Sequence, residues 1–193
     1  MANADEAVFL WINGWVGRQP LLDGIVEWVV SDYLVPVGMA LSLVGLWFAA
    51  GESQRRLRQQ VGVLVALSAM AVASGSVMLV NAFYFRPRPF EDLDVSLLFY
   101  QPTDSSFPAN TAAAVFAISA AVWGVNRQAG LVLFVAAGLY GLSRVYAGVH
   151  YPLDIVGGAA IGIVAAAAMA RAMHLLEPLP TMVIKVARIL CLA

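Results

Sequence analysis

Charged residues are few in this sequence. They make up 12% of its 193 residues, while 61% are hydrophobic and the mean hydropathy is +0.80. A soluble domain has about 45–50% apolar and about 25% charged residues, so this chain has too little charge to solvate the surface of a soluble globule. The net charge of −1 gives no indication of nucleic-acid binding. The composition therefore indicates a membrane protein.

Cysteine and histidine are also scarce. The single cysteine, Cys191, lies in the C-terminal tail, which excludes an internal disulfide framework and a cysteine metal site. The two histidines, His150 and His174, are expected at opposite faces of the membrane, so they cannot share a metal ion. We therefore expect neither a metal ion nor another cofactor.

Long hydrophobic runs fill most of the chain. They do not alternate with polar residues, which excludes an outer-membrane β-barrel. The length allows about five or six transmembrane helices of about 20 residues each, with no room for a soluble domain. The sequence thus predicts an all-α, polytopic membrane helical bundle that forms a single domain over residues 1–193. The expected spans cover residues 34–50, 61–85, 109–123, 131–142 and 153–172.

Shorter amphipathic segments flank the expected bundle of residues 34–172. Residues 1–33 mix acidic residues with tryptophans, a pattern typical of short interfacial helices. The first span begins near Leu21 instead if Pro36 only kinks the helix. Residues 173–193 predict an amphipathic tail on the cytoplasmic surface.

The distribution of basic residues predicts the orientation of the chain. Segment 51–60 contains three arginines and is expected in the cytoplasm, because basic loops stay on that side. Alternation of the spans then places Arg127, Arg171, Lys185 and Arg188 on the same side. We expect a multi-pass protein of the inner (plasma) membrane, with a cytoplasmic C-terminus and a site that faces the periplasm or the exterior.

Three arginines on the expected outer face, Arg86, Arg88 and Arg144, do not follow this rule. Polar residues at membrane depth are costly and usually functional. Further polar residues, Asn110, Thr111, His150 and Asp154, fall at span ends on the same face. Arginines, a histidine and a carboxylate together suit an oxyanion with two or more charges, because guanidinium groups match phosphate oxygens.

His150 and Asp154 are four residues apart and would share one face of a helix that begins near His150. An aspartate bonded to one ring nitrogen fixes the tautomer and directs the other nitrogen's lone pair at a substrate. Phosphoryl transfer mainly requires positioning and charge stabilisation, which arginines supply without a metal. This spacing favours a nucleophilic histidine.

The polar residues match short motifs of a known family. Ser143, Arg144, His150 and Asp154 fit its pattern of Ser-Arg, five residues, His, three residues, Asp. Arg88-Pro89 fits the end of another motif, which usually opens with a lysine where this chain has Asn81. The sequence resembles the type-2 phosphatidic acid phosphatase superfamily and, within it, the bacitracin-resistance type of undecaprenyl-diphosphate phosphatase. The remaining motif, usually Pro-Ser-Gly-His, is Pro108-Ala109-Asn110-Thr111 here and lacks the histidine.

The resemblance implies roles for these residues. His150 would be the nucleophile, Asp154 the residue that orients it, and Arg144 and Arg88 phosphate ligands with Ser143 nearby. Further residues implied at the phosphate site are Arg86, Asn81, Asn110 and Thr111. The implied reaction is hydrolysis of a polyprenyl diphosphate to the monophosphate through a phosphohistidine. The implied partners are this lipid phosphate and the surrounding membrane lipids; the sequence does not indicate an oligomeric state.

The missing histidine bears on the substrate. In the family it is a general acid, and such help is worth about 10²–10⁴-fold. A departing prenyl phosphate is a weaker base than an alkoxide and needs little protonation, so the loss favours a diphosphate substrate. Two alternatives stay open. One is a broad lipid-monophosphate phosphatase or lipid phosphotransferase, and the other is a degenerate protein that binds or transports lipid phosphates without turnover.

Overall fold

The computed structural model describes residues 4–49 and 53–190, and its regular structure there is helical. Cys191 lies outside the described residues. The helices are α1 (Ala4–Asn13), α2 (Pro20–Val30), α3 (Leu34–Trp47), α4 (Ser53–Phe83), α5 (Pro89–Asp92), α6 (Asn110–Val125), α7 (Arg127–Tyr146), α8 (Pro152–Leu175) and α9 (Leu179–Ile189).

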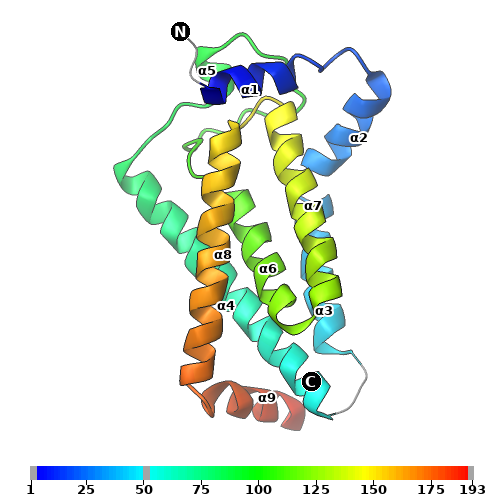
Figure 1. Cartoon of the computed structure of the whole chain (residues 1–193), viewed down its shortest axis with the longest axis vertical. Coiled ribbons are helices and arrows are strands. Elements are labelled where there is room, and N and C mark those ends of the chain that lie inside the picture. The colour runs from blue at the N-terminus through cyan, green and yellow to red at the C-terminus, as the bar shows by residue number, and fades with distance from the viewer. Residues whose placement is uncertain (1–3, 50–52, 191–193) are drawn as a thin grey trace.

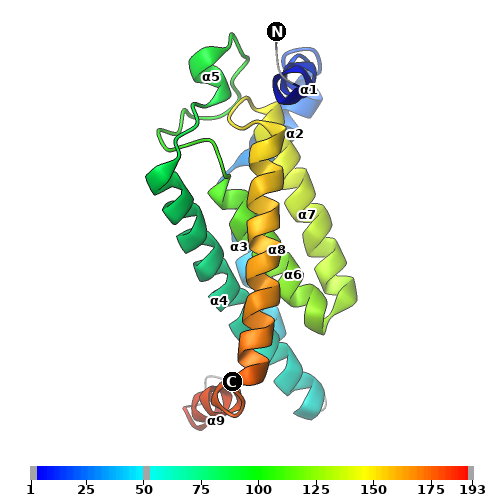
Figure 2. The same cartoon turned by 60° about the vertical axis from the view of Figure 1, so that its left-hand side comes forward.

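The long helices form an elongated bundle. Helices α3, α4, α6, α7 and α8 run along the long axis, whereas α1, α2 and α5 lie at the upper end and α9 lies across the lower end (Figures 1 and 2). Helices α4, α6 and α8 pack closely, and their shared core consists largely of alanine and valine. Small side chains let the helix backbones approach one another. The protein is thus the all-helical bundle that the sequence predicts.

The number of membrane-span candidates is lower than the expected five to six. In the described part of the chain, α4, α7 and α8 are long and apolar enough to cross a membrane. Helices α2 and α3 pass the same criteria together and count as a fourth candidate if the bent pair is one span. Helix α6 has 16 residues and is shorter than a standard span. The composition and these helices make this a multi-pass membrane protein.

Helix boundaries also differ from the expectation in two places. Helix α4 begins at Ser53, so most of the segment expected as a loop at 51–60 is helical. Its Arg, Gln and Leu residues have high helix propensity, which extends the helix beyond its apolar part. Helix α8 begins at Pro152, two residues after His150, because proline is favoured in the first turn.

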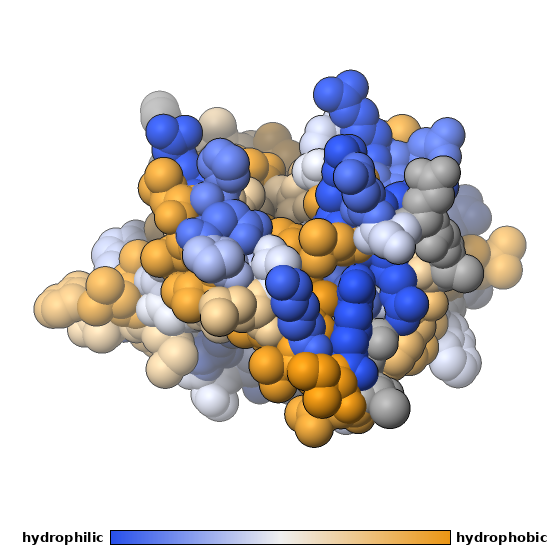
Figure 3. Space-filling view, turned by 90° about the horizontal axis from the view of Figure 1, so that it is seen from below, coloured by the Kyte–Doolittle hydropathy of each residue, from blue (hydrophilic) through white to orange (hydrophobic). Residues whose placement is uncertain are grey.

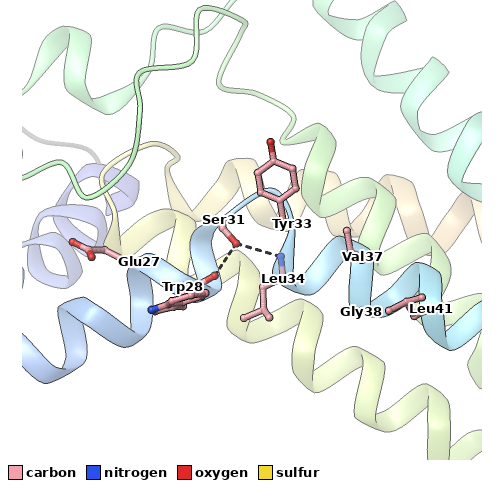
Figure 4. Close-up of a pocket in the computed structure, with 8 residues that line it drawn as sticks. All are labelled: Glu27, Trp28, Ser31, Tyr33, Leu34, Val37, Gly38 and Leu41. Carbon is pink, nitrogen blue, oxygen red and sulfur yellow. Dashed lines mark hydrogen bonds between the residues drawn. The ribbon is translucent and has the colours of Figure 1, made fainter.

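The chain does not bend at Pro36, where a kink was the condition for a first span that begins near Leu21. Pro36 lies in the first turn of α3, where proline costs no hydrogen bond. The bend of 49° lies between α2 and α3. Ser31 holds it, since its Oγ donates to the Trp28 carbonyl at 2.8 Å and accepts from the Leu34 N–H at 3.2 Å (Figure 4). A cavity of about 660 Å³ opens along this bend.

The lower end of the bundle carries basic residues and the C-terminal helix. Ile184 of α9 is buried, and Arg188 donates a 2.9 Å hydrogen bond from Nη2 to Gln60 Oε1 of α4. Figure 3 shows long hydrophilic side chains standing beside hydrophobic ones at this end. Residues 179–189 form a separate helix, whereas residues 173–175 of the expected tail belong to α8.

Glycines bring α8 into backbone contact with α6. A Cβ added to Gly158 would lie 2.3 Å from the Ala109 carbonyl oxygen, and one added to Gly162 would lie 2.3 Å from that of Ala113. Above them, the Ala109 N–H donates to the Asp154 carbonyl at 3.1 Å. This contact fixes the start of α8 against the start of α6, where the predicted site residues lie.

Candidate active site

The predicted site residues meet at the upper end of the bundle. Four segments converge there: α1, the α2–α3 bend, the loop from Tyr84 to Ala109, and the turn from α7 to α8. Asn13 of α1 anchors two of them, because its Nδ2 donates to the Ser96 and Tyr146 carbonyls at 2.8 Å each. Helix α1 therefore stabilises the site from above.

The turn between α7 and α8 presents His150. Gly148 in this turn has a φ of +87°, and a Cβ there would lie 3.0 Å from the Ser96 carbonyl oxygen. Only glycine adopts this conformation at low cost and leaves the space free. Because the chain reverses at Gly148, His150 points into the protein and is 4% exposed.

Hydrogen bonds determine the tautomer of His150. Its Nδ1 lies 3.0 Å from the Ser106 carbonyl oxygen, and its Nε2 lies 3.2 Å from Arg88 Nη1. A carbonyl oxygen only accepts and a guanidinium only donates. We therefore assign the proton to Nδ1 and the lone pair to Nε2. Nε2 is the nitrogen that can attack a substrate once Arg88 Nη1, which donates to its lone pair here, turns to the substrate instead.

Burial has the largest effect on the protonation of His150 and lowers its pKa below the usual value of 6.5. The nearby Asp154 carboxylate acts in the opposite direction and raises the pKa, whereas the positive charges of Arg88 and Arg144 lower it further. The imidazole is therefore neutral at pH 7. A neutral imidazole is the form that can act as a nucleophile.

Asp154 lies beside His150 but does not bond to it as closely as expected. Its Oδ2 is 3.7 Å from Nδ1, which is an ion-pair distance, whereas the Ser106 carbonyl takes the direct hydrogen bond. Asp154 is fully buried and accepts hydrogen bonds from Ser106 Oγ and the Tyr151 N–H. Ser106 thus links the carboxylate and the imidazole.

Arg88 lies directly against His150. Its Nη1 also donates to the Val149 carbonyl at 2.8 Å. Its Nη2 donates to Asp104 Oδ1 at 2.7 Å, and its Nε to the Asp104 carbonyl at 3.0 Å. The guanidinium is therefore fixed beside the Nε2 of His150, at the position where a phosphate ligand is required.

Arg144 approaches from the last turn of α7. Its Nη2 donates to Asp32 in the α2–α3 bend and to the Tyr140 hydroxyl. The guanidinium also lies 4.6 Å from the centre of the Phe99 ring. Its Nε is buried without a hydrogen-bond partner among the described residues. Arg144 therefore keeps one buried donor without an acceptor in the described part of the chain.

Arg86 differs from the other two arginines because both of its partners are buried. Its Nη1 lies 2.6 Å from Asp154 Oδ1, and its Nη2 lies 2.8 Å from Asp5 Oδ2. The guanidinium also stacks on the Tyr151 ring at 4.1 Å. These contacts orient Asp154 and join α1 to the site, so the geometry favours a supporting role over direct phosphate binding.

The other predicted site residues differ in what they contact. Asn110 and Thr111 line a cavity of about 310 Å³ together with Asp32 and apolar residues of α3, α4 and α6. Ser143 Oγ donates to the Tyr140 carbonyl of its own helix. Asn81 lies near the end of α4 with Oδ1 buried and unpaired within the described segments.

Sequence reasoning did not single out several residues of the site. They are Asp5, Asp32, Asp104, Ser106 and Tyr140. One signal was present, since the outer segments carry acidic residues on the same face as three arginines that do not follow the charge rule. Which acid pairs with which arginine depends on the fold.

The bundle and the site define a multi-pass membrane protein with a buried, neutral histidine whose Nε2 lies against a buried arginine. Residues 62–177 match the PAP2 superfamily, and the chain belongs to this superfamily of membrane lipid phosphatases. This confirms the family predicted from the motifs.

Relatives support the same assignment. The chain is 29% identical to undecaprenyl-diphosphatase BcrC of Bacillus subtilis over 93% of this chain and 89% of the relative. It is 28% identical to the putative undecaprenyl-diphosphatase YbjG of Escherichia coli over 85% of this chain and 80% of the relative. The crystal structure of Aquifex aeolicus LpxE is similar with a TM-score of 0.66 and 28% identity, over 88% of this chain and 96% of that one.

Proposed function

We propose that this protein hydrolyses a polyprenyl diphosphate, of the undecaprenyl class, to the monophosphate. The observation that carries the proposal is His150, whose neutral ring has its Nε2 lone pair beside Arg88. The two similar proteins named as undecaprenyl-diphosphatases support the choice of lipid. Arg88 and Arg144 act as the phosphate ligands.

The reaction has two steps. His150 Nε2 attacks the terminal phosphorus, and the bond from this phosphorus to the bridging oxygen breaks. The prenyl phosphate leaves with the bonding electrons. Asp154, 3.7 Å from Nδ1, stabilises the positive charge of the phosphorylated ring. Water then attacks the phosphohistidine, releases inorganic phosphate and returns the imidazole to its neutral form.

The second motif supports a diphosphate over a monophosphate. The position of the family's general-acid histidine is Thr111, whose hydroxyl does not protonate a leaving group at neutral pH. A phosphate leaving group departs with little protonation, whereas an alkoxide does not. Loss of the acid is therefore tolerable for the diphosphate and damaging for a lipid monophosphate.

The same substitution favours one alternative, a protein that binds lipid phosphates without turnover. Phosphate release from a long-chain polyprenyl diphosphate and from phosphatidic acid separates the two functions. We expect release from the diphosphate, loss of that release in His150→Ala, and slow release from phosphatidic acid that rises in Thr111→His. Equal or faster monophosphate turnover by the natural chain would contradict the substrate assignment. Binding of both lipids without release would establish the alternative.

We further propose that the chain crosses the membrane five times, through α3, α4, α6, α7 and α8. The count requires the 16-residue α6 to span, with its ends near the two membrane faces. Basic residues at the lower end favour a cytoplasmic location for α9. The site then faces the periplasm or the exterior of the inner (plasma) membrane.

A further inference from the structure

We propose that Asp32 and Asp104 are displaceable counter-ions, which compete with phosphate for Arg144 and Arg88 and so keep the site from retaining inorganic phosphate. The proposal rests on the proposed function, in which these two arginines bind the phosphate groups of the substrate. It concerns the release of the phosphate product and the resistance of the site to surrounding phosphate.

In each of these two ion pairs the arginine is far more deeply buried than its aspartate. The Arg88 side chain is 3% exposed, while its partner Asp104 is 64% exposed. The Arg144 side chain is also 3% exposed, and its partner Asp32 is 37% exposed. In both pairs the cation is inside the protein, and the carboxylate reaches it from the solvent side.

This inequality makes the carboxylates exchangeable. A partly exposed aspartate that leaves its arginine loses little solvation, because its carboxylate already contacts water. A buried guanidinium without an anion is costly. The arginines therefore keep an anion at all times, and a phosphate replaces the carboxylate when it binds.

Arg86 provides the internal contrast. Its partners Asp5 and Asp154 are 5% and 0% exposed, so neither can move into solvent without unfolding the site. A phosphate cannot displace them at low cost. The site thus contains one permanently paired arginine and two arginines whose partners can exchange.

A phosphate also satisfies a group that Asp32 leaves unpaired. Arg144 Nε is buried and has no hydrogen-bond partner among the described residues, although Nη2 of the same guanidinium donates to Asp32. Asp32 accepts from Nη2 with Oδ1 and from the Tyr100 hydroxyl with Oδ2, whereas a phosphate in its place has oxygens for both guanidinium nitrogens. This difference favours exchange toward a bound phosphate while a phosphate is present.

Contacts at the α2–α3 bend return Asp32 to Arg144 after product release. The Tyr100 hydroxyl donates to Asp32 Oδ2 at 2.9 Å. The hydrogen bonds of Ser31 hold the adjoining backbone in its bent form (Figure 4). Asp104 is similarly held, since its backbone carbonyl accepts from Arg88 Nε. Both carboxylates are therefore positioned to replace a departing phosphate.

The test measures inorganic phosphate binding to the full chain in detergent by isothermal titration calorimetry, which requires no turnover. We expect Asp32→Asn and Asp104→Asn each to tighten phosphate binding about 5-fold, the upper range for loss of one such competing pair. The double variant should tighten it about 25-fold if the two pairs act independently. Product inhibition by phosphate should increase in parallel.

Asp23→Asn is the matched control. Asp23 lies in α2, close to Asp32 in the sequence, and accepts from the Tyr146 hydroxyl instead of an arginine. Its substitution should leave phosphate affinity unchanged. Unchanged or weaker phosphate binding in both Asp32→Asn and Asp104→Asn would overturn the inference, because it would mean that the carboxylates only hold the arginines in place. Failure of the natural chain to bind phosphate would instead count against the proposed function.

Discussion

His150 is held between one acceptor and one donor, and its charged neighbours act on it in opposite directions. Asp154 stabilises the protonated ring, whereas Arg88 destabilises it. The nucleophile is active above its own pKa, which burial places below 6.5. The rate of a phosphatase that uses this ring should therefore fall only on the acidic side of that value.

Two variants that each remove one charge should shift the acid limb of the pH profile in opposite directions. Asp154→Asn removes a negative charge, lowers the pKa of His150 further and shifts the limb of kcat/KM to lower pH. Arg88→Gln removes a positive charge, raises that pKa and shifts the limb to higher pH. The measurement is kcat/KM as a function of pH for both variants and the unchanged chain. The same lipid is used throughout, because its own ionisation then affects all three profiles equally. Shifts in the same direction would contradict the placement of His150 between these charges.

At the residue scale, the sequence predicts those residues that a short motif defines. His150 lies beside Arg88 and Asp154, whereas Arg144 contacts Asp32 and Tyr140 and reaches His150 only through its charge. Asp32 and Asp104 could not be assigned in this way, because their partners Arg144 and Arg88 lie far from them along the chain or across a loop. The supporting role of Arg86 depends on the burial of Asp5, which composition does not reveal.

The contact between α6 and α8 controls the site at the scale of the elements. Gly162 lies against the Ala113 backbone, so an added Cβ has no space without separating the helices. Gly162→Ala should lower the free energy of unfolding by about 1–3 kcal/mol and lower activity, because α8 carries Asp154. Thermal unfolding in detergent and phosphate release measure the two effects.

Gly138 provides the control for this prediction. It also lies inside a helix, but nothing lies within 4 Å of an added Cβ. Gly138→Ala should leave activity unchanged and should not destabilise the protein, because alanine is the better helix former. Equal destabilisation by both substitutions would mean that the α6–α8 contact is not as tight as described.

At the scale of the elements, hydrophobic runs predict where the long helices lie but not where they begin, end or bend. The expected spans at 61–85, 131–142 and 153–172 fall on α4, α7 and α8, but every helix is longer or shifted at its ends. Polar residues with high helix propensity extend α4 past the apolar part. The bend between α2 and α3 depends on Ser31 hydrogen bonds that a hydropathy pattern does not contain.

At the scale of the whole molecule, the ends of the bundle differ in chemistry. The upper end contains the site and the lower end carries α9 (Figure 1), and hydrophilic side chains gather at the lower end (Figure 3). In the sequence, this end includes Arg55, Arg58 and Arg188. A site at the ends of the helices lets a lipid headgroup reach water while its chain stays in the bilayer. In the proposed orientation, which rests on the basic residues of the lower end, the upper end faces away from the cytoplasm.

Labelling of single cysteines tests this orientation. In a Cys191→Ala background, Asp94→Cys lies in the upper loop and Gln54→Cys at the lower end of α4. A membrane-impermeant maleimide should label Asp94→Cys in intact cells or spheroplasts and Gln54→Cys only after lysis. The reverse pattern would show that the site faces the cytoplasm.

The central claim is that His150 takes the terminal phosphoryl group of a polyprenyl diphosphate. The most direct measurement mixes the enzyme with lipid labelled at the terminal phosphorus, quenches the reaction in alkali and follows the label on the protein. We predict acid-labile, alkali-stable label on the natural chain, none on His150→Ala, and none from lipid labelled at the inner phosphorus. Turnover that survives in His150→Ala would contradict the account.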